Sequence, residues 1–255
     1  MIQARESTGP SLSDRFTFDC GEDPELRAES SGTFAEDQRV SQRLDSHQTT
    51  TLGVVLCGGN SQRMGQDKAC LPFDGRTLIE RAVRILEPIS REVLLATGTS
   101  QRYADLHKRF VLDVVPNAGP LAGLCAALAE VAPGELLCCL ACDMPFAATS
   151  HFEALIAEAH SSQLDVCMLA ADGRSEPLCA VYRSSCLGPM RAALADGERR
   201  VKSFHGYAKE DGDQLSIGKV DVSRETGSDH RCTLNVNTPD DYSRALESSP
   251  EKERP

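Results

Sequence analysis

The first residues that could do chemistry lie in a glycine-rich loop that directly follows the apolar run 52–55. The loop, residues 56–68, contains several glycines and the cations Arg63 and Lys68. Glycines let backbone N–H groups approach a polyphosphate closely, and the two cations add positive charge nearby. The loop lacks a Walker A motif, because Ala69 follows Lys68 where Ser or Thr is needed, and it lacks the dinucleotide pattern G-x-G-x-x-G. We therefore expect it to hold a nucleoside triphosphate through loop backbone and a lysine, rather than to be a plain connection.

Side-chain oxygens that could bind a metal ion occur at two further places. Asp143 ends the apolar run 136–142, and Pro145 keeps that strand from simply continuing. A lone carboxylate at a strand end is a typical Mg²⁺ ligand, because that ion takes its other oxygens from water and phosphates. Asn235 and Asn237 are two residues apart on a short extended segment, so both are expected on one face, where one could complete the metal shell or hold a phosphate. The competing interpretations are a helix cap for Asp143 and a turn for the asparagines.

Strand-like and helix-like patterns alternate through the middle of the chain, and they must position these side chains. Apolar runs predict strands at 54–56, 92–97, 110–112, 136–141, 166–170 and 178–182, and periodic or capped segments predict helices at 77–86, from Pro120, at 152–159 with Ser150 as cap, at 187–194 and from Pro239. Such alternation predicts an α/β fold, a Rossmann-like three-layer α/β/α sandwich around a mostly parallel sheet. Ligands of such sheets bind beyond the carboxyl ends of the strands, so the loop and Asp143 are expected at one shared edge.

The two ends of the chain differ from this middle part. Residues 1–50 contain ten acidic and five basic residues and sustain no strand or helix period. We expect a disordered acidic extension there, with a docking tail for a partner as the alternative. The folded domain is expected over residues 51–247, and residues 248–255 form a short charged tail.

Charge and hydropathy exclude several classes of protein. The 255 residues carry a formal net charge of −11 with a pI near 5.0, which argues against an extended nucleic-acid-binding surface. No apolar run approaches the ~20 residues needed to cross a bilayer. The N-terminus also lacks the apolar core of a secretory signal. We expect a cytoplasmic protein that binds neither nucleic acid nor membrane.

Eleven cysteines are present, and most lie in apolar, strand-like or helix-like surroundings. Cys139 and Cys142 spell C-x-x-C, a spacing found in zinc and redox sites. No second C-x-x-C pair and no spaced histidine pair completes a zinc set, and the pair lies within an apolar run. We interpret these cysteines as small buried hydrophobic residues.

Taken together, four ordered motifs resemble one known family. Residues 56–68, continuing through 71–75, are similar to the signature of the molybdenum cofactor guanylyltransferases, which belong to the nucleotidyltransferases that activate sugars and cofactors with NTPs. Three later segments fit the same family in its order: Gly119–Gly123, Ala141–Phe146 and Asn235–Pro239. The resemblance runs from about Gly53 to Leu246, and it identifies 51–247 as the nucleotidyltransferase domain, of the nucleotide-diphospho-sugar transferase type.

The resemblance implies a magnesium-dependent transfer of GMP from GTP to the terminal phosphate of molybdenum-molybdopterin, with release of pyrophosphate. Neither a covalent intermediate nor a general base is expected, because a phosphate nucleophile is already ionised. The product would serve molybdoenzymes of the dimethyl sulfoxide reductase type, and recipient enzymes or other cofactor-biosynthesis proteins are the protein partners it implies.

The same resemblance assigns roles to individual residues. The backbone of Leu56, Cys57 and Gly58 would face the base and the ribose, and Asp113 would bind the nucleotide. Lys68 would bind the triphosphate, and Asp143 would bind both the nucleotide and Mg²⁺. Lys68 and Asp143 would be the catalytic residues. Asn237 is preferred over Asn235 for the metal or phosphate, and Glu176–Leu178 would lie on the pterin side. Two positions depart from the family: Cys57 stands where alanine is common, and Ala96 where some members carry an asparagine that helps to bind nucleotide.

Other functions remain as competing hypotheses. A cytidylyltransferase for the same cofactor, or another NTP-transferase, would share the motifs and differ in base preference. The Pro-Leu-Ala-Gly form of residues 120–123 favours guanine by resemblance. A non-catalytic cofactor carrier is a rival of another class, and the presence of Lys68 and Asp143 argues against it.

Overall fold

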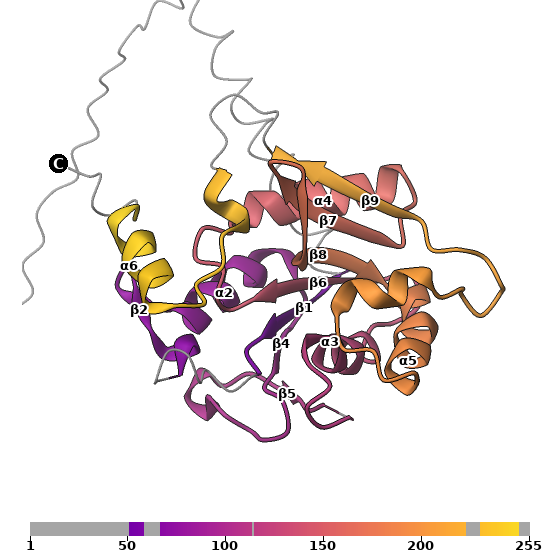
Figure 1. Cartoon of the computed structure of the whole chain (residues 1–255), viewed down its shortest axis with the longest axis horizontal. Helices are drawn as coiled ribbons and strands as arrows, with labels where there is room; N and C mark the ends of the chain where they lie inside the picture. The colour runs from indigo at the N-terminus through magenta and orange to yellow at the C-terminus, as the bar shows by residue number, and fades with distance from the viewer. Residues whose placement is uncertain (1–50, 59–66, 114, 223–229, 250–255) are drawn as a thin grey trace, which may run out of the picture. The chain divides into compact units, whose positions relative to one another are not determined.

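Seven strands form one sheet that runs through the described part of the chain (Figure 1). In the computed structural model the described residues are 51–58, 67–113, 115–222 and 230–249, so the predictions for 1–50, and for most of the tail, lie outside them. The sheet order is β5-β4-β1-β6-β8-β7-β9. Its strands are β1 Thr51–Leu56, β4 Val93–Ala96, β5 Phe110–Val111, β6 Leu136–Ala141, β7 Val166–Ala171, β8 Arg174–Arg183 and β9 Ile217–Asp221.

Strand directions confirm the expected mostly parallel α/β sheet, with one reversal. β1 pairs in parallel with β4 and β6, while β8 pairs antiparallel with both β6 and β7. The reversal follows from a two-residue hairpin between β7 and β8, in which Asp172 and Gly173 have φ of 51° and 77°. Asp-Gly favours this tight turn because both central residues need positive φ. The predicted strand at 178–182 is therefore the second half of a hairpin strand.

Helices cover both faces of the sheet, which makes the three layers that the sequence predicts (Figure 1). On one face α2 (Leu78–Leu86) and α4 (Thr149–Ser161) pack against the sheet, and on the other α3 (Pro120–Leu128) and α5 (Leu187–Ala195) do so. β1 shows how one strand serves both faces: Val55 belongs to the first core, whereas Leu52 and Val54 belong to the second. Successive side chains point to opposite faces of a strand, so a run that is apolar throughout is what a doubly covered strand needs.

Smaller elements complete the structure beside the sheet. A hairpin of β2 (Pro72–Phe73) and β3 (Arg76–Thr77) packs with α6 (Pro239–Glu247) in a third apolar cluster that includes Phe73, Phe146 and Val236. Helix α6 begins as predicted, with Thr238 as N-cap and Asp241 accepting from the Thr238 N–H at 2.9 Å. The short 3₁₀ helices are η2 Lys68–Cys70, η3 Glu87–Ile89, η4 Ala104–Leu106, η5 Ser184–Cys186, η6 Val201–Gly206 and η8 His230–Thr233.

One predicted cap is wrong. Helix α4 begins at Thr149, so Ser150 lies inside its first turn. The N–H of Ala148 instead donates to Nδ1 of His151 at 3.1 Å, and the Thr149 hydroxyl donates to the Ile85 carbonyl of α2 at 2.9 Å. A contact between two helices thus sets where α4 starts, and local capping preference alone does not show it. None of the described helices is long and apolar enough to span a membrane.

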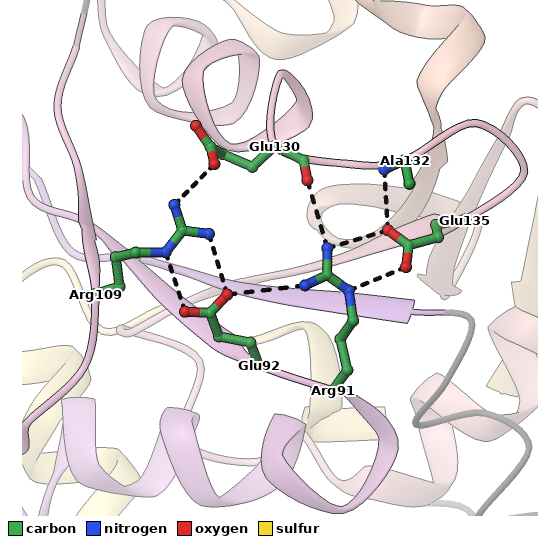
Figure 2. A network of polar contacts seen from close by, with 6 residues as sticks. All are labelled: Arg91, Glu92, Arg109, Glu130, Ala132 and Glu135. Carbon is green, nitrogen blue, oxygen red and sulfur yellow. Dashed lines mark hydrogen bonds and ion pairs between the residues drawn. The ribbon is translucent and has the colours of Figure 1, made fainter.

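An ion-pair network joins the amino ends of three strands (Figure 2). Arg109, just before β5, bonds both oxygens of Glu92, just before β4, at 3.0 Å each, and reaches Glu130 at 2.7 Å. Arg91 bonds Glu135, just before β6, at 3.0 and 3.2 Å. The hydrogen bonds from Arg109 hold the pKa of Glu92 below its usual value. The network therefore ties the sheet together at the edge opposite to the carboxyl ends of β1, β4 and β6.

We expect Arg109→Ala to lower the free energy of unfolding at neutral pH by about 1 kcal/mol or less, because the paired groups are partly exposed to solvent. The loss should shrink in about 1 M salt, which screens exposed charges. It should also disappear as the pH falls through the lowered pKa of Glu92, since the ion pair stabilises the fold only while that carboxylate is charged.

Urea denaturation at several pH values and salt concentrations measures this difference. Lys219→Ala is the matched control, because Lys219 makes a partly exposed pair with Asp221 on β9, away from the network. A loss for Arg109→Ala that is the same at every pH and salt concentration would contradict an ionic origin.

Candidate functional site

The carboxyl ends of β1, β4 and β6 bring together segments that are distant in sequence. Leu56, the last residue of β1, pairs with Ala96 at the end of β4 and lies beside the end of β6. Beyond the strands, the Cys57 N–H donates to the Ala96 carbonyl at 3.0 Å, and the Cys142 N–H donates to the Leu56 carbonyl at 3.1 Å. The glycine-rich segment after β1 and Asp143 after β6 therefore leave the sheet at the same edge, as the sequence predicts.

A pocket of about 380 Å³ opens at this edge. Its lining includes Leu56 and Gly58 after β1, Asp113 after β5, and Gly119 and Gly123 around the start of α3. Three of the predicted nucleotide contacts thus line one cavity. Lys68 and Asp143 are not part of this lining and form a second group of side chains.

Bare backbone shapes the pocket where glycines approach other segments. A Cβ on Gly58 would lie 2.8 Å from the backbone nitrogen of Gly98, so the loops after β1 and β4 touch backbone to backbone. A Cβ on Gly123 would meet the Ala96 Cβ at 3.2 Å and the Asp113 Oδ1 at 3.4 Å. Close approach of this kind needs glycine at position 58, because a side chain there would meet the backbone of Gly98. Ala96 leaves this wall of the pocket apolar.

Asp113 supplies a carboxylate to the pocket wall. Its N–H donates to the Gly98 carbonyl at 2.8 Å, which fixes the residue across from the β4 end. Its side chain is half-buried, and this burial raises the pKa of the carboxyl above its ordinary value. A carboxylate is a pure acceptor when ionised, so Asp113 can receive two hydrogen bonds from a donor pair on a base or a ribose.

The second group consists of Lys68, Asp143 and Asn237. The Lys68 ammonium forms an ion pair with Oδ2 of Asp143 and donates to Oδ1 of Asn237 at 3.2 Å. Asn237 is brought close because the neighbouring Val236 N–H donates to the Asp143 carbonyl at 2.8 Å. Asn235 has another partner, Glu176, at 3.2 Å. The two asparagines that sequence reasoning placed on one face thus bond to different side chains, and Asn237 is the one beside Lys68 and Asp143.

The donor set around Asp143 fits a cation that brings most of its own ligands. Asp143 is 8% exposed, and its Oδ1 has no hydrogen-bond partner among the described residues. The described residues contain no group of three or more His, Cys, Asp or Glu side chains that could hold a metal ion. Mg²⁺ commonly binds through one or two carboxylates plus water and phosphate oxygens, so a single buried carboxylate with an unused oxygen suits it.

Sequence reasoning missed two residues at this edge, Arg102 and Tyr103. Arg102 lines the pocket and donates to Oδ2 of Asp67 at 3.2 Å, and the Tyr103 hydroxyl donates to the same oxygen at 2.6 Å. Oδ1 of Asp67 accepts from the Ala69 N–H at 3.1 Å. The sequence signal for Arg102 and Tyr103 is their position shortly after the end of β4, at the edge where ligands of such sheets bind.

The cysteines near the site are buried thiols, as interpreted from the sequence. Burial raises the pKa of the Cys57 thiol to about 12 and that of Cys142 well above its ordinary value. Both are therefore protonated at neutral pH, and a protonated thiol is a poor nucleophile. All of the described cysteines except Cys70 are buried, and they form no disulfide with one another.

We expect Gly58→Ala to lower the free energy of unfolding by about 1–3 kcal/mol, because the new Cβ would push against the backbone of Gly98. Urea denaturation measures this change. Gly206→Ala is the matched control, since a Cβ there meets nothing within 4 Å. Equal stability of the two variants would show that the loops after β1 and β4 are not packed as described.

The chain is similar to proteins of one known family. Residues 53–210 match the family described as MobA-like NTP transferase domain. A Carboxydothermus hydrogenoformans protein named "Probable molybdenum cofactor guanylyltransferase" is 35% identical over 193 residues, which cover 76% of this chain and 93% of that protein. A Xanthomonas euvesicatoria "Molybdenum cofactor guanylyltransferase" is 30% identical over 199 residues, covering 78% and 96%.

A solved structure shares the fold over most of its length. Molybdopterin-guanine dinucleotide biosynthesis protein A from Archaeoglobus fulgidus superposes with a TM-score of 0.64 at 25% identity, covering 77% of this chain and 97% of that one. The family match spans more than half of the chain and includes the end of β1, Lys68 and Asp143. The protein belongs to the MobA-like NTP transferase family.

Proposed function

We propose that this protein transfers GMP from GTP to molybdenum-molybdopterin and releases pyrophosphate, forming the guanine dinucleotide form of the cofactor. The observation that carries the proposal is the convergence of Lys68, Asp143 and Asn237 at the sheet edge that also opens the 380 Å³ pocket. A base-sized cavity lined by backbone, next to a lysine and a buried carboxylate, provides what nucleotidyl transfer requires. The relatives named as guanylyltransferases support the choice of GTP and of the cofactor as acceptor.

The pocket supplies binding and orientation of the nucleoside. The backbone of Leu56, Cys57 and Gly58 would face base and ribose, with Asp113 accepting hydrogen bonds from the opposite wall. Guanine presents two adjacent N–H donors on one edge, and a carboxylate matches such a pair with two oxygens. Gly123 leaves the base in contact with the start of α3, because it has no side chain. Fixing the nucleoside in this way holds the α-phosphate in place for in-line attack.

Lys68 and Asp143 are the proposed catalytic residues. Lys68 would leave Asp143 to neutralise the triphosphate, and Asp143 with its unused Oδ1 would hold a divalent cation, which we propose to be Mg²⁺. Such a cation, when bound, offsets the negative charge on the phosphates as pyrophosphate departs. Asn237 is placed to hold Lys68 or a phosphate in position. The acceptor phosphate is already ionised, so the chain needs to supply no general base.

We expect GTP with Mg²⁺ to raise the thermal stability of the full chain, with CTP, ATP and UTP giving much smaller shifts. A ligand that binds only the folded state adds ~2.7 kcal/mol at a hundred times its dissociation constant, so a preference for one base is measurable. A shift confined to CTP would replace the proposal with a cytidylyltransferase. The absence of any nucleotide shift would favour a cofactor carrier.

We expect Lys68→Ala and Asp143→Ala each to slow pyrophosphate release from GTP by about a hundredfold or more, as loss of a group that stabilises developing charge does. The assay uses the full chain with molybdenum-molybdopterin as acceptor. Lys219→Ala, on the edge strand β9, is the control for loss of a lysine and should keep normal activity. Near-normal turnover by both site variants would exclude the assigned roles.

A further inference from the structure

One guanidinium bonds to both residues that flank segment 58–66. Arg102 lies in the loop between β4 and η4. Its Nη2 donates to the Cys57 carbonyl at 2.9 Å, and its Nη1 donates to Oδ2 of Asp67 at 3.2 Å. Cys57 and Asp67 are ten positions apart in the sequence. Arg102 therefore holds Cys57 and Asp67 at a fixed distance from each other.

Tyr103 holds the same carboxylate from a second direction. Its hydroxyl donates to Oδ2 of Asp67 at 2.6 Å, and burial together with this bond raises the pKa of Tyr103, so the phenol remains a donor at neutral pH and above. Tyr103 has a φ of 63°, in the left-handed region that side chains disfavour. Strained backbone of this kind persists where its surroundings hold it in place. The Arg102 guanidinium also lies over the Tyr103 ring, 5.2 Å from its centroid.

Asp67 passes this restraint on to Lys68, the next residue. Oδ1 of Asp67 accepts from the Ala69 N–H at 3.1 Å, and its carbonyl accepts from the Cys70 N–H at 3.1 Å. These two bonds start the short helix η2, whose first residue is Lys68. The position from which the lysine side chain extends toward Asp143 thus depends on where Asp67 is held.

We propose that Arg102 is a positioning residue for nucleotidyl transfer: by holding the Cys57 carbonyl and the Asp67 carboxylate together, it sets the place of Lys68. The proposal rests on the proposed function, because it assigns Arg102 to the same reaction. Arg102 also lines the pocket, so a direct contact with nucleotide is the alternative role that a test must separate. A guanidinium can serve two acceptors at once in a fixed geometry, whereas a lysine ammonium is a point charge.

The first experiment tests the contact itself and needs no substrate. Hydrogen exchange is measured in the nucleotide-free full chain for Arg102→Gln, Arg102→Lys and Tyr103→Phe, with Arg109→Gln in the distant network as control. We expect amides 69–71 to exchange about tenfold faster or more in Arg102→Gln, the effect of losing charge-assisted hydrogen bonds. Exchange in β6 should stay unchanged, which separates local opening from global unfolding.

The other variants sharpen the first experiment. In Arg102→Lys, amides 69–71 should exchange nearly as fast as in Arg102→Gln, because one ammonium does not span both acceptors. In Tyr103→Phe their exchange rate should lie between those of Arg102→Gln and the native chain. Unchanged exchange of amides 69–71 in Arg102→Gln would overturn the proposal, as would full protection in Arg102→Lys. Should Arg102→Gln fail to fold, Arg102→Lys still tests the contact, since it keeps the positive charge and does not span both acceptors.

The second experiment is a double-mutant cycle on GTP affinity with Lys68→Ala, measured by calorimetry with Mg²⁺. If Arg102 acts through Lys68, Arg102→Gln weakens GTP binding in the native background and adds nothing in the Lys68→Ala background. Fully additive losses would instead show a direct contact with nucleotide and overturn the positioning role. A native chain that does not bind GTP would refute the proposed function, while hydrogen exchange would still decide whether the contact exists.

Discussion

The parallel pairing of β1 with β6 is the constraint on which the site depends. Six consecutive pairs, from Thr51 with Leu136 to Leu56 with Ala141, fix the two central strands against each other. A shift of one residue would turn every side chain of β1 to the other face and exchange its contacts with the two helical layers. The same register sets the end of β1 beside the segment that carries Asp143, where the Cys142 N–H donates to the Leu56 carbonyl. Burial on both faces of the sheet therefore determines the geometry of the polar residues at its edge.

The two sheet edges are stabilised by different means. At the amino ends, exposed arginines and glutamates join β4, β5 and β6, and any one pair contributes little. At the carboxyl ends Lys68 pairs with Asp143 and Arg102 with Asp67, and Asp143 is the most buried of these four side chains. Removal of Lys68 would leave the buried Asp143 carboxylate without its ion-pair partner, which is costly. A lysine proposed for catalysis therefore also compensates a buried charge.

Much of the fold could be predicted from the sequence because its signals are local. Continuous apolar runs marked the central strands, and Pro120 and Thr238 marked helix starts. The position of Asp143 directly after an apolar run predicted that it lies at the carboxyl edge of the sheet. The apolar run 178–182 does not indicate that β8 is reversed, and the signal for the reversal is the hairpin pair Asp172-Gly173. Strand β9 has no continuous apolar run, because it is a partly exposed edge strand.

Contacts between distant segments could not be predicted in this way. Arg102 bonds to residues 35 and 45 positions away, and nothing in the pattern of one loop specifies such partners. The pairing of Asn237 with Lys68, rather than of Asn235, depends on the hydrogen bond from the Val236 N–H to the Asp143 carbonyl. Side-chain chemistry suggested which residues matter, while tertiary packing decided which of them meet.

In the nucleotide-free site the Lys68 ammonium lies between Asp143 and Asn237 and serves as the counterion of the Asp143 carboxylate. An arriving ion does not find an exposed negative charge, because the chain has already compensated it from within. In the proposed reaction Lys68 would turn from Asp143 toward a phosphate, so binding of the nucleotide would be an exchange of partners for its ammonium. A protein with a net charge of −11 can in this way receive a polyanion without first building up a strongly positive cavity.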